Sequence, residues 1–351
     1  MSGFFSWISG LLSRKPVAAP VASASEPRLF NPADADSPGH QSTDSDLIVQ
    51  LEENLFCWLL DVEPGKLKVD VDGADEILAE LERRIENRHL DELPHQPATL
   101  PQLLKALSGE TIERSKISSI ILSDPKLTEQ LLQVANSPFF RHGHHYIESV
   151  DQAVFVLGLN GIRSVTAAAV MRPMMAARNS REALFAQRTW RWALSCARAT
   201  EMVARKHGED TSAYFVVGLL PGLAYLTIRR ELSRICRARG EGMEPEPALL
   251  RAALARQQWA VCQRLANEWK LPPKYHAWLL YAERPAPKQR HSAVTDGLLL
   301  GSREILRHAH QRSLPEQELY RIIDLPPAQI TEVRNALVAM LEEGRTSTSR
   351  V

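Results

Sequence analysis

Apolar residues recur at intervals of three and four positions along most of the chain from Asp46 onward, which is the spacing of one helix face. Such stripes include Leu47, Leu51, Leu55 and Trp58, then Ile77, Leu78, Leu81 and Ile85, and near the end Ile330, Val333, Leu337 and Leu341. The one candidate strand, residues 66–73, is short and isolated, and no repeat of fixed period is present. The pattern therefore predicts an all-α protein with short loops.

Capping residues punctuate these predicted helices. Asp124 stands before Pro125, as an N-cap stands before a proline in the first helical position. Ser149 and Gln152 have the spacing of a capping box, as do Thr99 and Gln102 in a preceding helix. We expect the helix after Ser149 to end at Gly158. A second, long apolar helix is then expected to run from Asn160 to about residue 177.

Composition narrows the classes of function. The 351 residues hold 42 Lys and Arg against 42 Asp and Glu, so no bulk charge attracts nucleic acid or membrane. The four cysteines form no C-x-x-C pair, which fits a reducing compartment and no zinc ribbon. Because no run of 18 apolar residues occurs, we expect no spanning helix. These features predict a cytoplasmic protein.

The first 45 residues differ from the rest. Residues 1–15 place Phe4, Ile8 and Leu11 on one face, which fits weak docking on a membrane surface or in a partner groove, although a plain mobile tail also fits. Residues 16–45 are rich in Pro, Ala, Ser and Asp and read as a disordered linker. We expect residues 1–45 to form a disordered tail with this short amphipathic peptide at its start. If the peptide docks, the protein is peripheral at the membrane.

Three segments then carry a family resemblance: "LPHQPATLPQLLKAL", "ISSIILSDPKLTEQLLQVANSPFF" and "IESVDQAVFVLGLNGIRSV". Together their S-D-P, L-x-x-x-A-N-S and A-x-x-x-L-G-L patterns resemble the HDOD (HD-related output domain) family of bacterial signalling proteins. The resemblance implies an all-α domain related to the HD phosphohydrolases over residues 93–290. It leaves an acidic helical extension at 46–92 and a C-terminal helical subdomain at 291–351.

The resemblance also implies where metal ligands would lie. HD phosphohydrolases hold divalent metals with a histidine, a His-Asp doublet and a further ligand. The matching positions here are Trp192, Pro221, Gly222 and Gln258. Tryptophan, proline and glycine supply no ligand atom, and a glutamine without neighbouring carboxylates is a poor one. We therefore expect no catalysis, no metal and no cofactor, a pocket filled partly by Trp192, and a break or kink at Pro221.

A basic stripe is a second candidate site. Residues 160–207 hold nine Lys and Arg against two acids, and one broad helical face carries Arg181, Arg188, Arg191, Arg198 and Arg205. This face could be solvated and partly paired with Glu201, packed against the acidic 46–92 helices, or docked on an acidic partner or a nucleic-acid backbone. Nucleic acid is disfavoured, because no aromatic platform alternates with the arginines.

Other chemistry-bearing residues are weaker candidates. His142, His144 and His145 could hold a metal, but the glycine among them favours a solvated loop. No phosphate-binding or nucleophile motif is present. We therefore expect a non-catalytic signalling adaptor or scaffold whose partners are signalling proteins with an acidic docking surface. The alternatives are a phosphohydrolase or nucleotide sensor with a displaced site, and a nucleic-acid-associated regulator that uses the arginines.

Overall fold

The computed structural model describes residues 44–97, 114–137, 139–140, 146–209, 211–240, 244–284 and 291–348. Within these ranges the chain forms twelve α-helices and two 3-10 helices, with no strand. The helices are α2 (Asp44–Leu60), η2 (Pro64–Lys68), α3 (Ala74–Glu86), α5 (Arg114–Leu122), α6 (Pro125–Ala135), α7 (Val150–Met171), η3 (Arg172–Met175), α8 (Ser180–Lys206), α9 (Thr211–Ala238), α10 (Pro247–Glu268), α11 (Pro273–Glu283), α12 (Ala293–His308), α13 (Glu316–Ile322) and α14 (Pro327–Thr348). The all-α prediction is confirmed.

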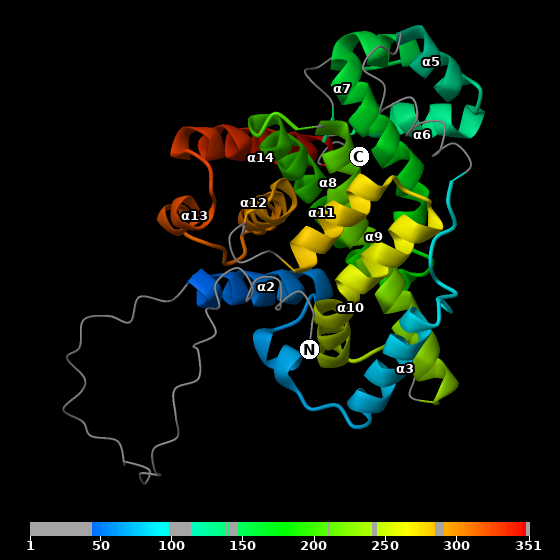
Figure 1. Ribbon diagram of the computed structural model, residues 1–351, viewed down its shortest axis with the longest axis vertical. Coiled ribbons are helices and arrows are strands. Elements are labelled where there is room, and N and C mark those ends of the chain that lie inside the picture. Colours follow the sequence, from blue (N-terminus) through cyan, green and yellow to red (C-terminus); the bar gives the residue numbers. More distant parts are fainter. Residues whose placement is uncertain are drawn as a thin grey trace, which may run out of the picture.

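Helix α8 forms the centre of the fold (Figure 1). It packs most extensively on α9 and α12, while α10 covers α9 on the side away from α8. Helices α2 and α3 lie at one end of the molecule, and the lobe of α5, α6 and α7 lies at the other. The predicted apolar stripes of α3 and α14 are buried, so burial of one helical face holds these outer helices to the core.

Local signals position the helix ends as the sequence predicts. Asp124 accepts backbone hydrogen bonds from Lys126 and Leu127 at the start of α6. Ser149 accepts one from the Gln152 amide at the start of α7. The segment expected as a candidate strand instead begins with the 3-10 helix η2, where Leu67 alone is buried. A single apolar anchor suits one helical turn better than a strand with no partner.

Helix α7 has a break at Gly158, where φ is 65° and ψ is −177°. This conformation is open to glycine and strained for other residues, so the expected helix end at Gly158 is confirmed. The following helix ends at Met171, earlier than the expected residue 177, because Pro173 lies in the first turn of η3. Residues Val150–Met175 are apolar and long enough to cross a membrane by length and composition alone, yet 56% of the most apolar window is buried in the fold.

Of the break or kink expected at Pro221, the break does not occur. Helix α9 runs without interruption from Thr211 to Ala238, with Pro221 and Gly222 inside it. Both residues are buried, so packing on both sides of the helix compensates for a weak local helix preference.

The acidic extension is held to the core by ion pairs as well as by apolar contacts. Asp61 pairs with Arg188 on α8, while Asp91 pairs with Arg234 on α9. Arg84 of α3 reaches the fully buried Glu231 of α9 at 2.6 Å. Helix α2 packs against α8 and α12, and α3 packs against α9 and α10. The candidate site lies between α8, α9 and α12.

Candidate functional site

Trp192 lies at the middle of α8 and is fully buried. Its indole nitrogen donates to the Ser302 hydroxyl of α12 at 2.9 Å. Its ring stacks on Tyr225 of α9, with ring centroids 4.7 Å apart and ring planes 28° apart. Trp192 therefore fills the space between α8, α9 and α12, as the sequence predicts.

The stack continues into the acidic extension. Phe56 of α2 also stacks on Tyr225, with ring centroids 6.1 Å apart and ring planes 18° apart. Phe56 and Tyr225 are both fully buried. The extension thus contributes an aromatic side chain to the interior of the helical domain, in the stack that contains Trp192, where the resemblance expects a histidine.

Glycines allow the helices around Trp192 to pack closely. A Cβ atom on Gly222 would lie 2.5 Å from the Cβ of Ala193, and one on Gly218 would lie 2.6 Å from the Cα of Ala197. On the other side of α8, Gly301 of α12 makes an equally close approach to Cys196. Gly222 therefore serves helix packing, and the space where the resemblance expects the second member of a His-Asp doublet is closed.

Three buried side chains, one each on α2, α9 and α10, have polar groups without hydrogen-bond partners. They are both carboxylate oxygens of Glu52, the hydroxyl of Tyr225 and both amide atoms of Gln258. Burial raises the pKa of Glu52 well above its usual range, and the Arg251 charge opposes this shift only in part. Burial also raises the pKa of Tyr225, and the nearby Glu52 adds to that shift. Unpaired buried groups of this kind are rare and call for an explanation.

These residues do not fit the divalent metal that the resemblance implies. Trp192 is committed to Ser302 and Tyr225, and the Gly222 position has no room for a carboxylate. Gln258 offers one amide oxygen, with no cluster of three or more His, Cys, Asp or Glu beside it among the described residues. Hard divalent ions need several oxygen or imidazole ligands, so the donor set is inadequate.

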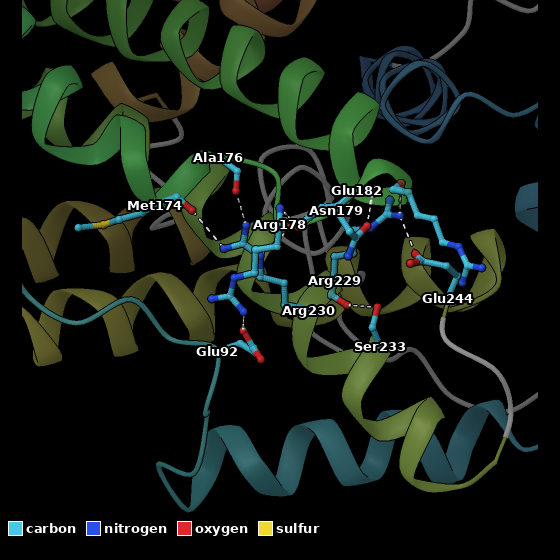
Figure 2. Close-up of polar contacts among 11 residues, drawn as sticks. Glu92, Met174, Ala176, Arg178, Asn179, Glu182, Arg229, Arg230, Ser233 and Glu244 are labelled. Atoms are coloured by element: carbon cyan, nitrogen blue, oxygen red, sulfur yellow. Dashed lines mark hydrogen bonds and ion pairs between the residues drawn. The ribbon is translucent and has the colours of Figure 1, made fainter. Parts of the chain in front are cut away.

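A polar clamp fixes the start of α8 against η3 and α9 (Figure 2). The Arg230 guanidinium on α9 donates to Glu182 at 2.6 Å and to the carbonyls of Met174 and Ala176 at 3.1 and 2.8 Å. Glu182 also accepts from the Arg178 amide at 2.9 Å. Because this clamp is nearly buried and its charges are paired, it is a structural joint between η3, α8 and α9.

The five arginines of the predicted stripe have different surroundings. Arg188 reaches α2, where it bonds the Trp58 carbonyl, pairs with Asp61 at 2.9 Å and lies over the Trp58 ring. Arg198 and Arg205 pair with the buried Glu201 at 2.7 and 3.5 Å. Arg191 is half-buried and Arg181 is exposed.

The stripe is therefore divided between two of the arrangements considered from sequence. Arg188 packs against the acidic extension, and the pair at Glu201 forms a local cluster on α8. A cavity of about 580 Å³ opens beside Arg188, with Asp61, Glu63 and Arg312 in its lining. His142, His144 and His145, for which the sequence favours a solvated loop over a metal site, and the peptide 1–15 lie outside the described residues.

Fold and site together define an all-helical HD-like domain whose interior carries aromatic and glycine residues at the expected ligand positions. The solved structure of a proposed metal-dependent phosphohydrolase of Shewanella amazonensis is similar, with a TM-score of 0.55 and 18% sequence identity. The match covers 77% of this chain and 100% of that protein. An HDOD domain protein of unknown function from Geobacter sulfurreducens follows at TM-score 0.50 and 16% identity, over 80% and 96%. At these identities the likeness shows the fold.

The family itself is shown by sequence. The HDOD domain model matches residues 93–285, which is more than half of the chain. The chain belongs to the HDOD family. No curated protein matches it.

Sequence reasoning missed Glu52, Phe56 and Tyr225. One signal was available, because Glu52 lies on the apolar face of α2, one turn after Ile48 and one turn before Phe56. A carboxylate within an apolar stripe is unusual and marks a buried polar group. The contact of Phe56 with Tyr225 joins positions far apart in the chain, which helical periodicity does not reveal.

Proposed function

We propose that this HDOD protein is a non-catalytic signalling adaptor or scaffold that acts by protein–protein interaction. The observation that carries the proposal is the aromatic stack of Phe56, Tyr225 and Trp192, which occupies the interior where the related phosphohydrolases would place metal ligands. A site filled by buried rings and closed by Gly222 leaves no room for a phosphate, a metal and a water. Membership of a family of signalling proteins supports the adaptor role.

The proposed partners are signalling proteins with an acidic docking surface. Arg181 and Arg205 are the most exposed of the five arginines, with Arg205 47% exposed, so they are the members best placed for an outside carboxylate. Arginine's planar fork suits such a contact. The other three arginines, Arg188, Arg191 and Arg198, are half-buried and would add positive charge to the same face. We place the protein in the cytoplasm, with weak peripheral attachment through residues 1–15.

Metal content and hydrolysis test the proposal directly. The full chain is incubated with zinc, manganese or magnesium, desalted and measured by elemental analysis, then assayed with phosphomonoesters and cyclic dinucleotides. We expect no stoichiometric metal and no turnover. About one metal per chain, or metal-dependent turnover, would instead support a phosphohydrolase with a displaced site, the activity that the name of the Shewanella neighbour suggests for that protein.

The membrane attachment has its own test. Flotation with anionic liposomes compares the full chain with a chain that starts at Asp44. A single short apolar face gives marginal, reversible binding, so we expect a small floating fraction for the full chain alone. Equal flotation of the two proteins would contradict the attachment.

A further inference from the structure

Helix α2 covers the degenerate site from outside the matched HDOD region. Its residues Glu52 and Phe56 are one helical turn apart on the core-facing side, and both are buried. Phe56 supplies the outer ring of the aromatic stack on Tyr225. The family match begins at residue 93, so this covering helix belongs to the extension.

The polar groups beneath α2 are poorly matched to it. Neither carboxylate oxygen of Glu52 has a hydrogen-bond partner, and the same holds for the Tyr225 hydroxyl and the Gln258 amide. The nearby Glu52 adds to the rise in the pKa of Tyr225, which is caused mainly by burial. Gln258 lies one helical turn before Cys262 on α10 and is fully buried, so these two side chains share one buried face of α10.

The docking of α2 is therefore favoured by its apolar contacts and by the ion pair of Arg188 with Asp61, but it is disfavoured at the buried Glu52. The charged groups that act on Glu52 are Arg251 on α10 and the adjacent Glu53 on α2, and the Glu52 charge in turn acts on Tyr225 of α9. Arg251 attracts the carboxylate, but Glu53 repels it and Tyr225 donates no hydrogen bond to it. The same site would accept a helix with an uncharged hydrogen-bonding side chain in place of Glu52 more readily than it accepts α2.

From this mismatch we infer that α2 is an autoinhibitory helix, which covers the degenerate site at rest and yields to a helix of a signalling partner. That partner helix carries an aromatic side chain at the Phe56 position and a neutral amide or hydroxyl one turn earlier, which can pair with the Tyr225 hydroxyl. The inference rests on the proposed function, because it treats the site as a place of protein contact.

The charge of Glu52 sets how firmly α2 is docked. Below the ordinary pKa of about 4.3, burial of this carboxyl group costs no free energy of ionisation, because the group is protonated in the docked and in the undocked helix alike. As the pH rises above that value, the exposed carboxyl ionises while the buried one resists, so docking weakens. A neutral Gln at this position should hold α2 in place at every pH.

Hydrogen exchange of the full chain tests the docking. Protection factors of α2 are measured from pH 5 to pH 8 and corrected for intrinsic exchange rates. In the wild type we expect α2 protection to fall with pH, while α8 and α9 stay protected. Glu52→Gln should remove the pH dependence and raise α2 protection about tenfold at pH 8. The control Glu63→Gln, on an exposed residue of the same extension, should match the wild type.

A labelled peptide tests displacement. The probe is a synthetic peptide of residues 44–61 with the change Glu52→Gln, followed by fluorescence anisotropy with the full chain. We expect it to bind the wild type, and to bind the Glu52→Gln chain about tenfold more weakly because that chain's own α2 is held more firmly. A second peptide that also carries Phe56→Ala should not bind.

Three results would overturn the inference. One is exchange of α2 together with α8 and α9 at every pH, which would make α2 an inseparable part of the core. The others are unchanged protection in Glu52→Gln, and equal binding of the probe to both chains. None of these depends on metal or turnover, so a failure here is distinct from a failure of the proposed function.

Discussion

Gly222 of α9 lies so close to Ala193 of α8 that a Cβ atom added to it would be 2.5 Å from the Ala193 Cβ. Both positions belong to helices in the middle of the core, so neither backbone can move freely. Alanine normally stabilises a helix by about 1 kcal/mol relative to glycine. Here the overlap outweighs that gain, because overpacking a core costs about 1–3 kcal/mol.

We therefore expect Gly222→Ala to lower the free energy of unfolding by about 1–3 kcal/mol, measured by urea denaturation. Gly65→Ala is the control, since nothing lies within 4 Å of a Cβ at that position. It should change stability by less than about 0.5 kcal/mol. If Gly222→Ala were stabilising, α8 and α9 would be less closely packed than described.

Pro221 gives a prediction of opposite sign. A proline inside a helix costs about 3 kcal/mol, because it removes one hydrogen bond and its ring clashes with the preceding turn. Helix α9 is continuous around Pro221, so an alanine can take the helical conformation there. Part of the gain is offset by lost burial of the ring. We expect Pro221→Ala to raise the free energy of unfolding by about 1–2 kcal/mol. A loss of stability would mean that the buried Pro221 ring contributes more through its packing than its missing hydrogen bond costs.

The behaviour of α9 shows what sequence can and cannot predict here. Helical periodicity, caps and the Gly158 break are local, so the sequence predicts them directly, whereas the burial of Trp192 is predicted from the family resemblance. Continuity through Pro221 depends on packing by α8 and α10, which local preference does not include. The division of the arginine stripe likewise depends on where α2 and Glu201 lie in space.

The hydroxyl of Tyr225 should be dispensable for stability. It is fully buried and has no hydrogen-bond partner, and a buried hydroxyl in this state costs about 1–3 kcal/mol. Tyr225→Phe keeps the ring stacked between Phe56 and Trp192. We expect thermal denaturation to show unchanged or higher stability, by up to about 2 kcal/mol.

Tyr320→Phe is the matched control for that change. The Tyr320 hydroxyl contacts Glu316 and lies 3.0 Å from the Thr331 hydroxyl, so its removal breaks hydrogen bonds that are present. We expect this variant to lose about 1 kcal/mol. If both variants lost stability equally, Tyr225 would have a hydrogen-bond partner in solution, such as a buried water.

Arg198 should matter to stability more than an exposed member of the same stripe. It donates to Glu201 at 2.7 Å, and Glu201 is fully buried, with Ser164 and Arg205 at 3.1 and 3.5 Å as its other partners. Arg198→Ala leaves one carboxylate oxygen without its charged partner in the interior, which costs about 1–3 kcal/mol. Arg181→Ala removes an exposed side chain and should change stability by less than about 0.5 kcal/mol.

A double-mutant cycle separates this contact from the loss of a long side chain. In the background of Glu201→Gln the charge that Arg198 neutralises is gone, so Arg198→Ala should then cost much less than it does in the wild type. Urea denaturation of the four proteins gives the coupling energy, which we expect to be at least about 1 kcal/mol. A coupling near zero would show that Arg205 and Ser164 satisfy Glu201 without help, and Arg198 would then be available to a partner.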